Sequence, residues 1–118
     1  MKSERGIVVV LSLDPAVGHE QKGVRPCVVV SAPEVIAEQR YPLVCVIPIT
    51  GTPGKGALYP RLAPGASGLS KPSFALIDQL RSVDKRRVTR FLGRVSMDEL
   101  KTIDEGLRLY LGLDSASL

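Results

Sequence analysis

Three short apolar runs, rich in Val and Ile, constrain the fold of this chain more than any other feature of its sequence. They span Ile7–Leu11, Cys27–Ser31 and Leu43–Ile49. β-Branched side chains favour strands, and a run without a polar member, such as Ile7–Leu11, predicts a strand that is buried on both faces. Pro48, inside the third run, predicts a sheet edge or a bulge, because proline donates no hydrogen bond to a neighbouring strand.

Weaker strand patterns fill the rest of the first 95 residues. Pro33–Arg40 is predicted to be a connection with one helical turn at most. Ala57–Leu62 alternates weakly and predicts an outer strand. Ser73–Leu80 carries apolar residues at even spacing, as on one face of a strand, and Val88–Leu92 predicts a further strand. Short strands joined by Gly- and Pro-rich turns are typical of a small antiparallel barrel or sandwich.

The C-terminal segment changes from strand to helical periodicity. Ser96 and Glu99 form a capping-box pattern, and Gly112 is typical of a helix C-terminus. Between them, apolar residues recur at helical spacing: Met97, Leu100, Ile103, Leu107, Tyr110 and Leu111. This spacing predicts a helix of about four turns whose continuous apolar face packs on the sheet. The predicted fold is mainly β with a C-terminal helix, and residues 1–118 are expected to form one domain.

Several classes of protein are excluded by composition. The apolar runs are far shorter than the ~18–20 residues that cross a bilayer, and the N-terminus shows no signal-peptide pattern. We therefore expect a cytoplasmic protein that does not associate with membranes.

Cys27 and Cys45 lie in apolar runs and are predicted to be reduced thiols that pack as small hydrophobes. One histidine and no zinc-like spacing of Cys and His predict that there is no metal or other cofactor.

Positive charge is concentrated late in the chain. Arg81–Arg94 holds six basic residues and one acid, whereas residues 96–118 hold two basic residues and five acids. A basic stretch of this kind attracts phosphate groups or an acidic peptide. It is equally consistent with a solvated strand edge that is kept basic against aggregation. Charge alone leaves both interpretations open.

The segment after the first apolar run is too polar for a core element. Asp14–Arg25 contains Gly18 and Gly23 among charged and amide side chains. Loops of this composition on a rigid scaffold often carry binding or catalytic residues. We therefore expect this loop to belong to the functional site.

Three ordered motifs link the chain to a known family. The first is Leu13-Asp14-Pro15-x-x-Gly18-x-Glu20-Gln21-x-Gly23-x-Arg25-Pro26, followed at once by a Val-rich strand; the others are Ile47-Pro48-Ile49-Thr50 and Asp78-Gln79-Leu80-Arg81-Ser82-Val83-Asp84-Lys85. Over about residues 5–113 the chain resembles the MazF/PemK/Kid family of toxin endoribonucleases. The resemblance implies a small SH3-like antiparallel β-barrel, a homodimer, and metal-independent cleavage of single-stranded RNA at short sequences. It also implies a cognate antitoxin and inhibition of translation and growth.

The same resemblance assigns site residues by their place in the motifs. The family's catalytic arginine falls on Arg25 and its catalytic threonine on Thr50. The loop residues that match its substrate-contacting loop, and the later residues that match positions lining the same groove, are His19, Glu20, Gln21, Lys22, Asp78, Gln79 and Arg81.

The chemistry of RNA cleavage suits these residue types. Attack of the 2′-hydroxyl on phosphorus needs a base, an acid and stabilisation of negative charge on the phosphoryl oxygens. The guanidinium of Arg25 offers a fork of donors to two phosphate oxygens. Thr50 could donate its hydroxyl to the same phosphate or orient the 2′-hydroxyl. His19 and Glu20 are the candidate bases.

Other interpretations of these residues stay open. Asp78 beside Arg81 is either a structural ion pair or a catalytic acid, and the amide of Gln79 could recognise a base edge. The basic stretch could hold RNA or receive an acidic C-terminal segment of the antitoxin. Two alternatives to a nuclease are a CcdB-like barrel that acts only by binding a protein such as gyrase, and a catalytically silent relative that binds nucleic acid or antitoxin.

Overall fold

The computed structural model describes residues 1–113, so the last five positions of the predicted 1–118 domain lie outside the described residues. The elements follow in the order β1 (Ile7–Ser12), β2 (Val24–Val29), α1 (Pro33–Ala37), β3 (Leu43–Thr50), β4 (Arg61–Leu62), β5 (Ser73–Ala75), η1 (Ile77–Gln79), β6 (Arg81–Asp84), η2 (Lys85–Arg87), β7 (Val88–Arg94) and α2 (Met97–Leu111), where η marks a 3-10 helix. Among the described residues, no helix has both the length and the apolar composition that crossing a bilayer requires.

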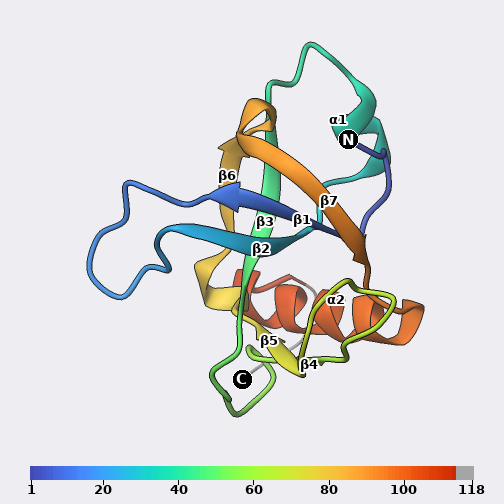
Figure 1. The fold of residues 1–118 in the computed structure, drawn as a ribbon. Coiled ribbons are helices and arrows are strands. Elements are labelled where there is room, and N and C mark those ends of the chain that lie inside the picture. The colour runs from blue at the N-terminus through green and yellow to red at the C-terminus, as the bar shows by residue number, and fades with distance from the viewer. Residues whose placement is uncertain (114–118) are drawn as a thin grey trace.

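The strands form a curled antiparallel sheet around β3. The strand order is β4-β5-β3-β2-β1-β7, and β6 pairs with β3 outside this path. One side of β3 pairs with β2, while the other side pairs first with β6 and then with β5. Figure 1 shows the sheet curling into a half-barrel with α2 across one end, close to β4 and β5, and the long β1–β2 loop projecting away. This arrangement matches the predicted mainly β fold with a C-terminal helix.

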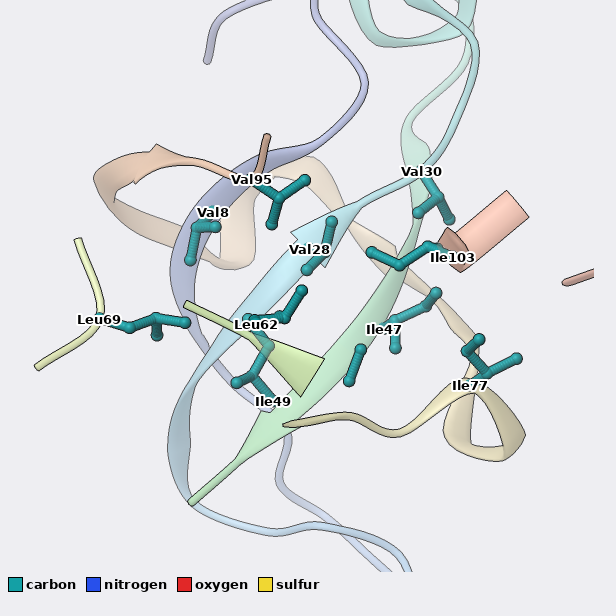
Figure 2. Close-up of a cluster of buried hydrophobic side chains, with 11 residues drawn as sticks. Val8, Val28, Val30, Ile47, Ile49, Leu62, Leu69, Ile77, Val95 and Ile103 are labelled. Carbon is teal, nitrogen blue, oxygen red and sulfur yellow. The ribbon is translucent and has the colours of Figure 1, made fainter. Parts of the chain in front are cut away.

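Each face of the sheet carries its own apolar cluster. In β1, Val8 belongs to one cluster, and Ile7, Val9 and Leu11 belong to the other. These four side chains are at most 1% exposed, so β1 is buried on both faces as its sequence predicts. Figure 2 shows the first cluster, in which Ile103 of α2 points toward side chains of the sheet. The second cluster lies beneath the segment that leads into the β1–β2 loop, because Leu13 belongs to it.

The ends of α2 are formed by the predicted capping residues. The hydroxyl of Ser96 accepts a 3.0 Å hydrogen bond from the backbone N–H of Glu99, whose carboxylate accepts a 2.8 Å bond from the N–H of Ser96. Gly112 closes the helix with φ of 68°, a left-handed conformation that glycine adopts without strain. These contacts satisfy backbone groups that a helix end otherwise leaves unpaired.

The apolar face of α2 is buried only in its middle turns, so the predicted continuous core face is wrong at both ends. Ile103 and Gly106 are buried, whereas Met97 is 81% exposed and Leu111 51% exposed. The reason is that the helix approaches the rest of the fold closely at one residue, Gly106. A Cβ added to Gly106 would lie 2.7 Å from the carbonyl oxygen of Ala57, so the helix crosses the end of the half-barrel there and its two ends extend past it.

In the region after residue 72, one strand prediction is wrong and one strand was not predicted. Ser73–Leu80 does not form one strand, because the N–H of Leu76 bonds to the carbonyl of Pro48 and the chain then turns through η1. The even apolar spacing reflects two elements that both bury side chains. The segment after the turn, Arg81–Asp84, is a strand paired with β3, although its own sequence holds a single apolar residue, Val83. That pairing, between segments distant in sequence, is what makes it a strand.

Other boundaries also shift. Only Arg61–Leu62 of the predicted strand Ala57–Leu62 is a strand, paired with β5, because the N–H of Tyr59 bonds to the carbonyl of Gly56 in a turn. α1 supplies the single helical turn expected after residue 33. The second strand begins at Val24 rather than at Cys27, which places Arg25 inside β2.

Pro48 lies in a central strand rather than at a sheet edge or in a bulge. Opposite it, β2 contributes Cys27. Its carbonyl accepts a 2.9 Å hydrogen bond from Leu76 on the other side. Because the nitrogen and carbonyl of one strand residue face the same side, the nitrogen of Pro48 faces the gap where β6 has ended and β5 has not yet begun. A missing N–H therefore breaks no strand pairing.

Both cysteines are free thiols. Cys27 is fully buried in the second cluster, and this burial raises the pKa of its thiol to about 12, against the opposing effect of the nearby Arg81 charge. Cys45 is half-buried, and its Sγ lies 3.7 Å from the hydroxyl of Ser82. Cys27 thus behaves as the small hydrophobe that the sequence predicts.

Candidate nucleic-acid interface

Two arginines from the basic stretch hold the base of the β1–β2 loop, residues 13–23. Arg81 donates a 2.9 Å hydrogen bond from Nη1 to the carbonyl of Leu13. Arg87 donates from Nη1 to the carbonyls of Ser12 and Asp14, at 3.1 Å and 2.8 Å. These bonds use carbonyl acceptors and leave the positive charges unneutralised. The loop therefore begins between two guanidinium groups.

The tip of this loop is held by Gln79 of η1. The side-chain oxygen of Gln79 accepts a 2.6 Å hydrogen bond from the backbone N–H of Gln21, and its side-chain nitrogen donates to the carbonyl of His19 at 3.3 Å. Both ends of the amide are thus engaged by the loop. In this arrangement Gln79 positions the loop, and recognition of a base edge by its amide would require the loop to be released.

Asp78, next to Gln79 in η1, holds a second loop, the one between β3 and β4. Asp78 accepts a 2.7 Å hydrogen bond from the hydroxyl of Tyr59, and this bond raises the pKa of Tyr59. Tyr110 of α2 donates to the backbone carbonyl of Asp78 at 3.2 Å. The structural ion pair considered between Asp78 and Arg81 is wrong, because each is bonded to another partner. η1 therefore joins the two loops that flank the candidate site.

Two adjoining cavities lie between these loops and share four lining residues, His19, Gln21, Asp78 and Gln79. The first, here called the loop cavity, has a volume of about 290 Å³ and is also lined by Glu20, Pro48, Leu80 and Arg81. The second, the Thr50 cavity, has a volume of about 510 Å³ and is also lined by Thr50, Thr52, Pro53, Gly54, Tyr59 and Leu76. Together they form one groove with mixed polar and apolar lining.

Thr50 lines this groove from β3, and Arg25 lies on the adjacent strand β2. The register of β2 and β3 pairs Cys27 with Pro48 and Val28 with Ile47. The pairing ends at Cys27 and Pro48, two residues from Arg25 on β2 and two residues from the end of β3 at Thr50. The two predicted catalytic residues therefore lie on neighbouring strands, just beyond the paired segment.

The contacts of this pair leave reactive groups available. Arg25 donates from Nε to the carbonyl of Lys22 at 3.1 Å, and its two terminal nitrogens have no hydrogen-bond partner within residues 1–113. The hydroxyl oxygen of Thr50 accepts a 3.2 Å bond from the N–H of Thr52. Its hydroxyl proton therefore stays available for donation to a ligand. Thr50 itself is 8% exposed, so the sheet fixes its position.

Seven of the nine predicted site residues line the groove, and the other two, Arg25 and Lys22, line neither cavity and contact each other. His19 is exposed and borders both cavities. Glu20 borders the loop cavity, where its carboxylate accepts a hydrogen bond from the backbone N–H of Val17. The three motifs, distant in sequence, thus meet at one place.

The sequence did not predict that the β3–β4 loop supplies part of the lining of the Thr50 cavity. Thr52, Pro53, Gly54 and Tyr59 all border the Thr50 cavity. The one available signal was an aromatic residue in a Gly- and Pro-rich turn directly after the predicted catalytic threonine. Nothing in the spacing shows that the turn folds back beside η1, since the Tyr59–Asp78 bond spans 19 positions.

Most of the basic stretch has a structural use. Besides Arg81 and Arg87, Lys85 donates from Nζ to the carbonyls of Val35 and Glu38 at the end of α1. Salt bridges join Arg86 to Asp84 at 3.0 Å and Arg94 to Glu4 at 2.8 Å. These observations favour an architectural role for the stretch over a free basic patch. The charges of Arg81 and Arg87 nevertheless remain close to the groove.

Within the described residues, no group of three or more His, Cys, Asp or Glu side chains is placed to hold a metal ion.

Fold and groove together define a small curled-barrel protein with a threonine in the lining of a groove and an arginine on the neighbouring strand. The chain belongs to the PemK-like, MazF-like toxin family of type II toxin–antitoxin systems, whose model matches residues 4–111. The resemblance of the three motifs is thereby confirmed.

Individual relatives agree with this assignment. The endoribonuclease MazF9 of Mycobacterium tuberculosis (strain ATCC 25618 / H37Rv) is 36% identical over 115 residues, which cover 92% of this chain and 96% of that protein. The crystal structure of MazF from Deinococcus radiodurans is 29% identical with a TM-score of 0.75, covering 92% of this chain and 96% of that chain. A MazE–MazF crystal structure from the same organism is 28% identical with a TM-score of 0.75, covering 97% and 99%. These likenesses confirm the predicted fold and do not favour the CcdB-like alternative.

Proposed function

We propose that this chain is the toxin of a type II toxin–antitoxin pair and a metal-independent endoribonuclease. It cleaves single-stranded RNA at short sequences by attack of a 2′-hydroxyl on the adjacent phosphorus, and so inhibits translation and growth. The observation that carries this proposal is the meeting of the three motifs at one groove, with Thr50 in its lining and Arg25 on the neighbouring strand β2. The relative named as the endoribonuclease MazF9 supports the same chemistry.

Arg25 stabilises the negative charge that develops on the phosphoryl oxygens. Its terminal nitrogens form a planar fork that matches two phosphate oxygens. The bond from Nε to Lys22 fixes the orientation of the guanidinium before substrate binds. Preorganised donors of this kind stabilise a transition state without reorganising during the reaction.

Thr50 holds the same phosphate through its hydroxyl. Its oxygen already accepts a bond from Thr52, so the proton is the group that reaches the substrate. Proton transfer to and from the 2′-hydroxyl and the leaving oxygen falls to the loop, where His19 and Glu20 border the groove. A rigid strand end thus fixes the phosphate, while the loop supplies proton transfer and substrate contacts.

A direct test is incubation of a long unstructured RNA with the purified protein in excess EDTA. The expected result is a set of discrete fragments with 5′-hydroxyl ends, produced at reproducible sequences and absent with Arg25→Ala. Intact RNA with folded wild-type protein would contradict the proposal. Cleavage that requires an added metal would contradict its metal-independent mechanism.

The partners follow from the same assignment. We propose that the toxin forms a homodimer in the cytoplasm, that residues 1–118 act as one toxin domain, and that a cognate antitoxin binds through an acidic C-terminal segment. The Deinococcus radiodurans MazE–MazF structure supports a partner of this kind. The charges of Arg81 and Arg87 beside the groove offer an electrostatic attraction to such a segment. Affinity for an acidic peptide should therefore fall as salt rises, and a titration that gave the same affinity at low and high salt would remove this argument.

A further inference from the structure

Tyr59 supplies the one phenol ring of the Thr50 cavity. It lies in the turn before β4 and is half-buried, with Thr50 lining the same cavity. The chain has no tryptophan and five Phe and Tyr residues in all, of which Tyr59 is one. Hydrogen bonding and proton transfer in the groove do not require an aromatic ring, so the ring in this cavity needs an explanation of its own.

The ring is held from two directions. At its hydroxyl end, Tyr59 donates a 2.7 Å hydrogen bond to the carboxylate of Asp78. At its other end, Gly54 packs so closely that an added Cβ would lie 2.8 Å from the Cβ of Tyr59 and 3.0 Å from its Cγ. These contacts restrict rotation of the side chain and fix the plane of the ring. A fixed ring loses little entropy when a second planar group packs on it.

We propose that Tyr59 is a stacking platform for the base of a nucleotide that flanks the cleaved phosphate. This inference rests on the proposed function, because it takes the substrate to be single-stranded RNA held at Thr50. A phosphate bound at Thr50 places the neighbouring nucleotide at the Thr50 cavity, whose volume of about 510 Å³ lies within the range of small-molecule sites. Aromatic side chains bind single-stranded RNA in this way, by stacking on unpaired bases.

The polar lining of the cavity adds hydrogen bonding at the edge of the stacked base. Thr52 and Gln21 border the cavity together with the ring. The side chain of Gln21 is available for this role, because the bond that anchors Gln21 to Gln79 uses its backbone N–H. Stacking on Tyr59 supplies affinity for any base, and the amide of Gln21 supplies a preference among bases.

The experiment combines removal of the ring with removal of the base. A 13-nucleotide RNA is centred on a cleavage site mapped with the wild-type protein, and a series of copies carries an abasic ribose at each of three positions on either side of the cut. Single-turnover cleavage is measured for wild-type protein, Tyr59→Ala, Tyr59→Phe and Tyr110→Phe. Tyr110 is the matched control, because it also bonds to Asp78 but lies on α2 outside the cavity lining.

With intact RNA, Tyr59→Ala should lose about 5- to 150-fold in kcat/KM, the range produced by removing one stacking aromatic. At one abasic position the wild-type protein should lose a similar factor and Tyr59→Ala should lose nothing further. Tyr59→Phe should keep most of the base dependence, and Tyr110→Phe should behave as wild type. Losses that multiply at every abasic position would overturn the inference while leaving the nuclease intact. RNA left uncut by the wild-type protein would instead overturn the proposed function.

A second measurement needs no variant. The same RNA with 2′-deoxyribose at the cut cannot be attacked and stays bound, and 2-aminopurine replaces the base at the position identified above. Stacking on Tyr59 should quench its fluorescence on binding to the wild-type protein. An increase in fluorescence on saturable binding would show that the base is unstacked and would overturn the inference.

Discussion

Gln79 accepts a 2.6 Å hydrogen bond from the backbone N–H of Gln21, and this bond joins two segments that are 58 positions apart. One of these segments is the loop that carries the predicted substrate contacts, and the other is the 3-10 turn between β5 and β6. The neighbouring Asp78 bonds to Tyr59 in the second flanking loop. The shape of the groove therefore depends on two adjacent side chains of η1.

Replacing Gln79 should loosen the β1–β2 loop in two steps. Gln79→Glu keeps an acceptor for the N–H of Gln21 but removes the donor to His19, whereas Gln79→Leu removes both. Each lost bond should reduce local stability by about 0.5–1.5 kcal/mol. Amide hydrogen exchange at Gln21 should be faster in Gln79→Leu than in Gln79→Glu, with KM for RNA rising in the same order. Equal exchange in wild type and Gln79→Leu would show that the bond does not hold the loop.

The proposed action of Arg25 and Thr50 on one phosphate predicts a non-additive effect on cleavage. Removing one preorganised donor typically reduces the rate about 100- to 1,000-fold. Arg25→Lys should lose most of that factor, because an ammonium does not reproduce the guanidinium fork. Thr50→Val keeps the shape and removes the hydroxyl, so the loss should appear in turnover. The double variant should lose much less than the product of the single losses, since both residues act on one phosphate.

Single-turnover cleavage of a short RNA containing a mapped site measures these effects, and circular dichroism checks that each variant is folded. A folded Arg25→Ala protein that cuts at the wild-type rate would contradict the assignment. The search for the group that stabilises the phosphate would then move to the loop residues His19 and Glu20.

Local patterns account for the parts of this fold that were predicted well. The capping box of Ser96 and Glu99 and the β-branched run of β1 depend on neighbours within a few residues, so the sequence shows them directly. Arg25 and Thr50 could be placed because both belong to contiguous motifs next to strong strands. That their strands are neighbours in the sheet could not be read from either strand alone, because it needs the pairing of β2 with β3.

The parts that were missed depend on contacts between distant segments. Arg81–Asp84 becomes a strand only by pairing with β3. The exposure of Met97 and Leu111 follows from where α2 crosses the half-barrel at Gly106. The position of Tyr59 in the groove follows from its bond to Asp78. None of these contacts leaves a periodicity in the sequence.

The uneven burial of α2 predicts a large contrast between two truncations on one helix. Ile103 is fully buried, so Ile103→Ala should lower the free energy of unfolding by about 2–5 kcal/mol. Met97 is 81% exposed, so Met97→Ala should change it by no more than about 0.5 kcal/mol. Leu107→Ala, at a half-buried position against the same cluster, should fall between them. Denaturant unfolding measures all three, and a large loss for Met97→Ala would indicate that its face is buried in a dimer.

Gly106 offers a test in which two effects oppose each other. In an exposed helix interior, Gly→Ala stabilises by about 1 kcal/mol through helix propensity. At Gly106 the added methyl would lie 2.7 Å from the backbone oxygen of Ala57, which has no rotamer to adjust. Gly106→Ala should therefore lower the thermal midpoint, while Glu105→Ala, one position earlier and exposed, should leave it nearly unchanged. A raised midpoint for Gly106→Ala would show that α2 does not approach this loop so closely.

Asp84 predicts a stability difference that depends on pH. Its carboxylate accepts hydrogen bonds from the side chain and then the backbone N–H of Arg86, and these lower its pKa from 3.8 to about 2. A carboxyl whose pKa is lower in the folded state stabilises that state above the pKa of the unfolded chain. This contribution is then lost as the pH falls through the folded-state value. Wild type should thus exceed Asp84→Asn in thermal midpoint by a nearly constant amount well above pH 4, and most of the difference should be lost by pH 2.

Arg86→Gln supplies the matched background for this experiment, because it removes the side-chain bonds and leaves the backbone N–H that also donates to Asp84. In that background, Asp84→Asn should produce a much smaller pH-dependent difference, since the first cause of the lowered pKa is gone. Thermal unfolding followed by circular dichroism between pH 7 and pH 2 gives each midpoint. A wild-type advantage over Asp84→Asn that persisted unchanged at pH 2 would show that it arises from packing or capping geometry rather than from the charge of Asp84.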